Sequence, residues 1–436
     1  MRRILPLVAL VVASCSMFQD KEVAKLVGPR IDVTVNATTL EATPGADVEP
    51  MSLPAARATV NWSQRGGNSM HYPQHVALPA KVVRAWTASI GSGAGRGKTM
   101  LHAPVVNSGR LFASDTSGQI TALDAKTGKE LWQVELPLKE DDTAVISSGL
   151  AVSGDLLFVA TAGGQVFALT ASSGKKVWEI DLAVPLRADP TVQGESVFVM
   201  SHDNRMFTLS ALTGAMQWTH SGIDETLSAM AASAPTASNG ALVVPYSSGE
   251  MYVLRATDGR YIWHDTLSSP FAGADPESTV SSIAAPPVVA DGFVYAVGMN
   301  GGLSAYALTN GQRFWKVNIQ TSQMPWVAGY QMFVVTDKGE MVALNRKDGG
   351  IRWVTDLNKD LPKDDDRRLW SGPLLAGERL IAVSNDGLAV SINPDTGTRM
   401  AATDLDVPST LPPVVADGAL YFLGDNGSVV CFRAEK

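Results

Sequence analysis

Residues 103–132 read APVVNSGRLFASDTSGQITALDAKTGKELW, and this stretch is the clearest copy of a repeated unit. It holds four short runs rich in apolar residues, with Ser117-Gly118 between the second and third runs and Thr127-Gly128 between the third and fourth. Glycine in such pairs supplies the positive φ that tight hairpins need. The stretch therefore predicts four short antiparallel strands joined by hairpins.

The end of this unit recurs along the chain. The copies are ALTASSGKKVW, TLSALTGAMQW, VLRATDGRYIW, AYALTNGQRFW, ALNRKDGGIRW and SINPDTGTRM. Including the first unit, the closing positions are Trp132, Trp178, Trp218, Trp263, Trp315, Trp353 and Met400, and Trp86 closes an earlier run, KVVRAW. Their spacing of 38 to 52 residues is typical of a propeller or a repeat array. We interpret the seven tryptophans as structural residues that dock one blade onto the next, and none of them as a ligand site.

The count of strands predicts how the ring closes. The last segment, residues 413–432, supplies only three strands, and residues 83–88 around Trp86 supply the missing fourth strand beside residues 429–432. Closure leaves only short, protected sheet edges. The predicted fold is therefore an all-β, eight-bladed propeller of four-stranded antiparallel blades, closed by an N-terminal strand.

The N-terminus has the pattern of a bacterial lipoprotein signal. Arg2 and Arg3 precede an apolar run at residues 4–13, which is too short to span a bilayer. Val12-Ala13-Ser14-Cys15 then fits a lipobox, with Cys15 as the lipidated residue. We expect a signal peptide at residues 1–14, a lipidated N-terminus with a flexible tether at residues 15–60, and the propeller at residues 61–436. The alternative is an ordinary signal peptide with an incidental cysteine.

Charge and cysteine content argue against a nucleic-acid-binding protein and against a protein held together by disulfides. The formal net charge is −8, which argues against a nucleic-acid partner because phosphate binding needs a basic surface. Cys15 and Cys431 are the two cysteines, so once Cys15 carries lipid no disulfide framework exists.

The unit A-L-D-A-x-T-G-K-x-x-W resembles the tryptophan-docking repeat of the pyrroloquinoline-quinone-like propellers. Two groups of these propellers have eight blades: the quinoprotein alcohol dehydrogenases and the BamB lipoproteins of the outer-membrane β-barrel assembly (BAM) complex. The lipobox, the compact length and the segment Asn61-Trp62-Ser63-Gln64-Arg65-Gly66-Gly67 before the first closing strand make the chain similar to the BamB family over nearly its whole length.

This resemblance implies a non-enzymatic scaffold, anchored on the periplasmic face of the outer membrane. It would bind the periplasmic domains of BamA and assist the folding and insertion of β-barrel proteins. Unfolded outer-membrane proteins are a further candidate partner, and no cofactor or metal is expected. In the family a Leu-Arg pair after the second blade contacts BamA, and Leu186-Arg187 stands at that place. We expect Leu186 to be an exposed apolar anchor. The alternative is that Arg187 only pairs with nearby Asp189.

The chain departs from the family pattern before the fifth blade. The family carries an Asp-x-Asp pair there, whereas this chain has Ser282-Ile283-Ala284. Asp275 or Glu277 could substitute only by a different loop path. This departure puts half of the usual contact surface in doubt.

Two other functions remain as alternatives. A quinoprotein dehydrogenase holds its quinone and a metal in the propeller funnel and commonly has two adjacent cysteines, a pair that this chain lacks. A generic envelope propeller that binds peptidoglycan or a small ligand is the other alternative.

Three motifs are expected to be ordinary loops. Residues 93–99 end like a phosphate-binding loop, but residue 92 is Ser and a strand is expected where a helix should follow. His71 and His75 have a metal-like spacing that Pro73 interrupts, and we expect a surface loop there. Residues 359–368, which include three consecutive aspartates, lack the spacing of a calcium loop and are interpreted as a solvated loop or a second partner contact.

Overall fold

The computed structural model of the chain describes residues 39–47, 50–94, 101–137, 148–223, 233–267, 282–283, 285–298, 302–359, 361 and 368–435. Residues 39–436 form one compact unit, and residues 1–38 form a second unit that lies outside the described part. The predicted signal peptide and Cys15 therefore fall outside the described residues. Within the described part no helix is long and apolar enough to cross a membrane.

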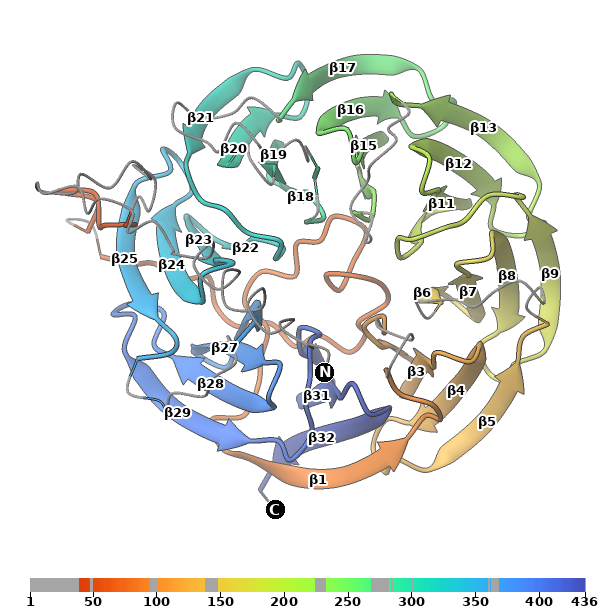
Figure 1. The fold of residues 1–436 in the computed structure, drawn as a ribbon, viewed down its shortest axis with the longest axis horizontal. Coiled ribbons are helices and arrows are strands. Elements are labelled where there is room, and N and C mark those ends of the chain that lie inside the picture. Colours follow the sequence, from red (N-terminus) through yellow and green to blue (C-terminus); the bar gives the residue numbers. More distant parts are fainter. Residues whose placement is uncertain are drawn as a thin grey trace, which may run out of the picture. The chain divides into compact units, whose positions relative to one another are not determined.

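The described strands form eight four-stranded antiparallel sheets, arranged as the blades of a propeller (Figure 1). Blade 1 has β2 (Val105–Asn107), β3 (Arg110–Ser114), β4 (Gln119–Asp124) and β5 (Glu130–Glu135), and blade 2 has β6 (Gly149–Ser153), β7 (Leu156–Ala160), β8 (Gln165–Thr170) and β9 (Lys176–Asp181). Blade 3 has β10 (Thr191–Gln193), β11 (Ser196–Met200), β12 (Arg205–Ser210) and β13 (Met216–Ser221), and blade 4 has β14 (Thr236–Ser238), β15 (Ala241–Pro245), β16 (Glu250–Arg255) and β17 (Tyr261–Thr266).

The remaining blades follow the same order. Blade 5 has β18 (Val288–Ala290), β19 (Phe293–Gly298), β20 (Gly302–Ala307) and β21 (Arg313–Val317), and blade 6 has β22 (Trp326–Ala328), β23 (Gln331–Val335), β24 (Glu340–Asn345) and β25 (Ile351–Asp356). Blade 7 has β26 (Trp370–Ala376), β27 (Arg379–Ser384), β28 (Leu388–Ile392) and β29 (Arg399–Asp404). Blade 8 has β30 (Val414–Ala416), β31 (Ala419–Leu423), β32 (Ser428–Ala434) and β1 (Val82–Ser89).

Blade 8 confirms the predicted closure. Its sheet order is β1-β32-β31-β30, so the N-terminal strand completes a blade that the C-terminus begins. Trp86 lies opposite Cys431, and the pairing extends from Val82 with Ala434 to Ser89 with Ser428. The two ends of the propeller are therefore joined by a backbone ladder, which removes the free edge of an open ring.

The burial pattern follows from the packing of the blades. The three inner strands of each blade are almost continuously buried, as in β3 and β4, because both sheet faces pack on neighbouring blades. The fourth strand lies on the outside and alternates between exposed and partly buried residues, as in β5 (Figure 1). The geometry therefore requires an uninterrupted apolar run in each of the three inner strands. In the fourth strand it requires exposed and partly buried residues to alternate.

The repeat tryptophans dock each blade onto the next. Six indoles donate Nε1–H to a backbone carbonyl of the following blade at 2.7–3.1 Å: Trp132 to Ala171, Trp178 to Ala211, Trp218 to Ala256, Trp263 to Leu308, Trp315 to Arg346 and Trp353 to Pro394. All seven rings, including that of Trp86, lie under a positive-φ glycine of the next blade: Gly128, Gly174, Gly214, Gly259, Gly311, Gly349 and Gly397. A Cβ on any of these glycines would come within 2.6–2.9 Å of the ring.

The closing position of blade 7 differs from the prediction. In the register of β28 and β29, Ala401 lies opposite Ser391, as Trp132 lies opposite Ala122 in blade 1, so Ala401 and not Met400 is the equivalent of the tryptophans. Met400 is 56% exposed. The reason is topological. The third and fourth strands of blade 8 come from opposite ends of the chain, so no turn joins them and no glycine is present for a tryptophan to dock under.

Residues 39–60 were assigned to the tether, but their described part lies against the propeller. Thr43 N–H donates to Ile351 O at 2.8 Å, and Ala46 O accepts from the Asn345 side chain at 3.1 Å. Arg57 N–H donates to His75 O at 2.9 Å. This part of the predicted tether therefore crosses the ends of the blade 6 strands on its way to the centre of the ring.

The strand order divides the connections between two faces of the propeller. Turns between first and second strands and between third and fourth strands lie on one face, which we call the turn face. Connections between blades and turns between second and third strands lie on the other, which we call the loop face. Residues 43–54 contact turn-face positions of blade 6, such as Gly329 and Gly350, so the chain approaches the ring from the turn face.

Candidate functional site

The centre of the ring is filled by the chain itself. Residues 59–76, which we call the hub segment, pass once around the axis and contact the innermost strand of each blade or, in blade 8, the turn that follows this strand (Figure 1, orange). Hydrogen bonds of 2.7–3.2 Å join Trp62 to Val106, Ser63 to Val152, Gln64 to Val192, Ser69 to Ala237, Met70 to Val289, Gln74 to Trp326, Val76 to Leu375 and Thr59 to Asp417. The hub segment thus contacts blades 8, 1, 2, 3, 4, 5, 6 and 7 in that order.

The expectation of a surface loop at the two histidines is wrong, because this stretch runs around the axis of the ring and both side chains are buried structural residues. His71 is 1% exposed, and its Nδ1–H donates to Pro287 O at 2.8 Å. His75 is also 1% exposed, and its Nδ1–H donates to Pro54 O at 2.8 Å. Burial lowers the pKa of His71 to about 4, so this imidazole is neutral at neutral pH. Among the described residues, no cluster of three or more His, Cys, Asp or Glu side chains is suited to a metal.

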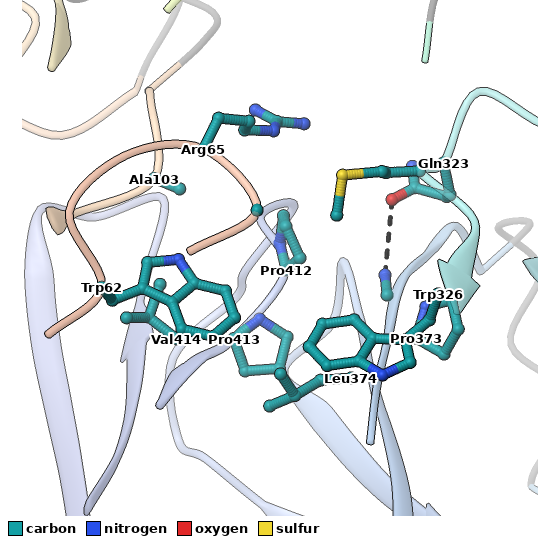
Figure 2. A pocket seen from close by; sticks show the side chains of 13 residues that line it. Trp62, Arg65, Ala103, Gln323, Trp326, Pro373, Leu374, Pro412, Pro413 and Val414 are labelled. Carbon is teal, nitrogen blue, oxygen red and sulfur yellow. Dashed lines mark hydrogen bonds between the residues drawn. The ribbon is translucent and has the colours of Figure 1, made fainter. Parts of the chain in front are cut away.

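A small cavity remains beside the hub segment on the axis. Its walls are mainly apolar and come from the hub segment and the inner strands of blades 6, 7 and 8, as Figure 2 shows. The rings of Trp62 and Trp326 lie nearly parallel there, with centroids 6.2 Å apart. The cavity volume is about 30 Å³, which accommodates about one or two water molecules. This cavity is too small for a ligand of the size of a quinone cofactor.

The loop that carries Leu186 and Arg187 is on the loop face, between β9 and β10. Leu186 is 2% exposed and packs in the core of blades 2 and 3, and its backbone bridges to Ser201. The expectation of an exposed leucine anchor is therefore wrong, because the loop turns this side chain inward to cover the end of the sheets. Arg187 is partly exposed, and burial lowers its pKa somewhat. Arg187 is the residue of the pair that a partner can reach.

Asp189 does not have the role that the sequence suggested as an alternative. It is 5% exposed, and its carboxylate accepts from His102 Nδ1 at 2.7 Å and from Arg65 at 3.3 Å. Burial raises its pKa, but the neighbouring His102 and Arg65 outweigh burial and hold the pKa at about 2. Asp189 is therefore an ionised, buried carboxylate that joins this loop to the hub segment and to the segment before β2.

The other candidate contacts are only partly described. Ser282 and Ile283, at the place of the family Asp-x-Asp pair, are buried at 2% and 1% exposure. Residues Asp275 and Glu277, and the aspartates within residues 362–367, lie outside the described residues. Arg368, at the end of that charged loop, forms an ion pair of 2.6 Å with Asp386.

The phosphate-binding alternative for residues 93–99 lacks its helix. Residues 95–100 are outside the described part, but residues 101–104 are not helical and lead into β2. Gly93 packs on Asn426, and its carbonyl accepts from Thr116 at 2.9 Å. The described part of this stretch is a loop that connects blade 8 to blade 1.

Sequence reasoning missed the hub segment and the contacts of Arg65. Successive residues of the hub segment contact different blades. The apolar residues of the segment therefore show neither the period of 2 of a strand nor the period of 3.6 of a helix. The available signal was a high density of Gly, His, Trp and Asn in residues 61–75 directly before a strand. Such residues are common where backbone polar groups must be satisfied without regular structure.

Comparison with known proteins first defines the fold class. The solved structure of BamB from Moraxella catarrhalis superposes with a TM-score of 0.68 at 17% identity, covering 81% of this chain and 100% of that one. A quinohemoprotein alcohol dehydrogenase from Comamonas testosteroni superposes with a TM-score of 0.69 at 14% identity, covering 87% and 82%. The fold is thus that of the eight-bladed propellers of both groups, and it does not by itself separate them.

Sequence similarity separates them. The family model described as "Outer membrane protein assembly factor BamB" matches residues 79–141, 116–355 and 310–400. BamB of Escherichia coli K12 is 30% identical over 350 residues, covering 79% of this chain and 87% of that relative. BamB of Yersinia pestis is 29% identical over 363 residues, covering 81% and 88%. The chain belongs to the BamB family of outer membrane protein assembly factors.

Proposed function

We propose that this chain is a non-enzymatic subunit of the BAM complex, which binds the periplasmic domains of BamA and assists the assembly of outer-membrane β-barrels. The observation that carries the proposal is the similarity to relatives named BamB over about four fifths of the chain. Unfolded outer-membrane proteins are a further candidate partner.

The filled axis supports a binding role over a cofactor-dependent one. The hub segment contacts every blade and, in the part of the chain that the structure describes, occupies the axis of the ring beside a cavity of about 30 Å³. What the fold offers to partners is therefore its set of loops, held on a stiff frame. The loop face carries the longest connections and includes Arg187.

We propose Arg187 as a direct contact to BamA and Leu186 as the residue that fixes the loop from inside. Arginine suits a contact to backbone carbonyls or carboxylates, because its guanidinium donates hydrogen bonds in a planar fork. Leu186 sets the backbone on the N-terminal side of Arg187 through its burial and its bridge to Ser201.

Membrane attachment would come from Cys15. After removal of residues 1–14, a cysteine that carries a diacylglycerol on its thiol, with or without a third acyl chain on its amine, gives stable anchoring without a spanning helix. We propose that the protein is attached in this way to the periplasmic face of the outer membrane. Incorporation of radiolabelled palmitate, lost in the Cys15→Ala variant, tests this part of the proposal. Unchanged labelling of that variant would contradict it.

The central test is a binding titration of residues 16–436 against the periplasmic domains of BamA from the same organism. We expect binding at micromolar concentration or tighter, weakened at least roughly tenfold by Arg187→Glu. Arg260→Glu is the matched control, because Arg260 is an exposed arginine in a turn-face hairpin of blade 4. Binding that survives Arg187→Glu would place the contact elsewhere, and absence of binding would contradict the BamA partner.

The dehydrogenase alternative has its own test. The chain, incubated with pyrroloquinoline quinone and calcium and then freed of excess cofactor, should show no retained quinone absorbance and no dye reduction with alcohols. A retained stoichiometric quinone would overturn the non-enzymatic assignment.

A further inference from the structure

We infer that Asp189 is a positioning residue that locks the Arg187 loop to the hub segment, so that the shape of the partner-binding loop depends on how the hub segment is seated. This inference rests on the proposed function of Arg187 for its meaning in binding. Its structural core concerns only residues 182–190 and can be tested without a partner.

The hub segment contacts both the end of the loop and the strand that follows. The Gln64 side chain bonds to both backbone groups of Val192 in β10, accepting from N–H at 2.8 Å and donating to the carbonyl at 3.2 Å. The next residue, Arg65, donates to the Asp189 carboxylate at 3.3 Å. Two consecutive hub residues thus hold the chain on either side of Pro190.

A second attachment comes from blade 1. His102, three residues before β2, donates Nδ1–H to the other oxygen of Asp189 at 2.7 Å. The side chains of Asp189 and His102 are only 6% and 11% exposed, so solvent screens this contact little. A single carboxylate therefore ties together the Arg187 loop, the hub segment and the chain before blade 1.

The rest of the loop is held by packing. Leu186 is buried, His202 N–H donates to Pro185 O at 2.9 Å, and Ala188 is 3% exposed. A Cβ on Gly149 would come within 2.8 Å of the Asp189 backbone, so blade 2 closely supports the same point. Arg187 is the partly exposed residue between two fixed neighbours, an arrangement that reduces the ordering cost when a partner binds.

Removal of the charge should release the loop without unfolding the ring. Asp189→Asn keeps the size of the side chain but loses the ionised partner of Arg65 and His102. We expect backbone amides of residues 182–188 to exchange hydrogen roughly tenfold faster or more, with the exchange of the inner strands of distant blades unchanged. Arg65→Lys, which retains the positive charge, should restore much of the protection that Arg65→Met loses.

The matched control is Glu250→Gln. Glu250 is another buried carboxylate, 7% exposed, and accepts from Ser248 in a loop-face turn of blade 4. Its substitution removes a buried charge elsewhere in the ring, so it should leave exchange in residues 182–188 unchanged. Equal loop exchange in the wild type and Asp189→Asn would overturn the inference, as would faster exchange in all eight blades.

A double-mutant cycle on BamA affinity tests whether the contacts of Asp189 with Arg65 and His102 affect binding. If Asp189 positions Arg187, then Asp189→Asn weakens binding in the wild-type background and has little further effect after Arg187→Ala. If Asp189→Asn lowers the affinity for BamA by the same factor with and without Arg187→Ala, Asp189 does not act by positioning Arg187. If the chain does not bind BamA, the exchange experiment still decides the lock, so failure of the lock and failure of the proposed function remain distinguishable.

Discussion

Tyr421 donates its hydroxyl hydrogen to the carbonyl of Ala125 at 3.0 Å, across the seam between blade 8 and blade 1. In six other junctions the equivalent carbonyl accepts the indole N–H of a repeat tryptophan, for example Ala171 from Trp132. At the seam Arg433 also donates to Ala125 O at 3.0 Å, and the buried Nε1 of Trp86 has no hydrogen-bond partner among the described residues. The ring is thus closed by chemistry that differs from that of its other junctions.

This difference predicts that replacing a repeat tryptophan by phenylalanine destabilises the protein less at the seam than at another junction. Trp132→Phe removes both ring area and the bond to Ala171, whereas Trp86→Phe removes ring area alone. We expect Trp132→Phe to destabilise the protein by about 1 kcal/mol more than Trp86→Phe, which is the typical net value of a hydrogen bond. Chemical denaturation of both variants measures this difference, and an equal or larger loss for Trp86→Phe would contradict the described seam.

The docking of tryptophan under glycine predicts a second contrast. Gly214 has φ +72°, and a Cβ there would lie 2.7 Å from the Trp178 ring, whereas Gly109 has a similar φ of +74° with nothing within 4 Å. Both alanine variants carry backbone strain of about 1 kcal/mol. Gly214→Ala should cost roughly 2 kcal/mol more, because the ring must also move. Thermal unfolding of the two alanine variants measures the difference. Similar melting temperatures would show that the Trp178 indole moves aside at little cost.

The empty docking position in blade 7 predicts that the repeat consensus does not apply there. Ala401→Trp restores the repeat pattern but gives the new ring no glycine turn to dock under. We expect a change within about 0.5 kcal/mol, as for an ordinary surface substitution. Stabilisation by more than about 1 kcal/mol in denaturation would show that blade 8 offers a docking site after all.

Burial of His71 predicts a pH dependence of stability. The folded pKa of about 4 lies below the ordinary value of 6.5, so between these values the unfolded chain binds more protons than the folded chain. Stability should therefore fall as pH decreases from about 6.5 to about 4, by up to roughly 3 kcal/mol from this residue. In His71→Gln, which cannot take up that proton, the free energy of unfolding should change less over this interval. Parallel curves for the two proteins would rule out His71 as the source.

The sequence was sufficient for the fold because the repeat has a fixed relation to the blade. In six of the seven Thr-Gly or equivalent turns the glycine precedes a tryptophan by four residues, and counting these units predicted eight blades and the pairing of residues 83–88 with the C-terminal strand. Met400 was misassigned because blade 7 has no tryptophan to mark the position, and the residue four places after Gly397 is Ala401, which the register of β28 and β29 confirms as the equivalent.

The candidate site was less predictable because it depends on tertiary contacts. Leu186 lies in a loop sequence without periodicity, so its burial follows only from the packing of blades 2 and 3. Asp189 and Arg65 are 124 residues apart, and no local pattern relates them. The hub segment could be located by composition, but its path around eight blades required the assembled ring.

A photo-crosslinking amino acid placed in the protein in cells tests whether the loop face is the surface that binds BamA. It would replace Arg187 on the loop face or, as the control, Tyr330, which is 74% exposed on the turn face. We expect a crosslinked product with BamA from position 187 and none from position 330. Crosslinking to BamA from position 330 alone would contradict the assignment of the loop face as the partner-binding surface.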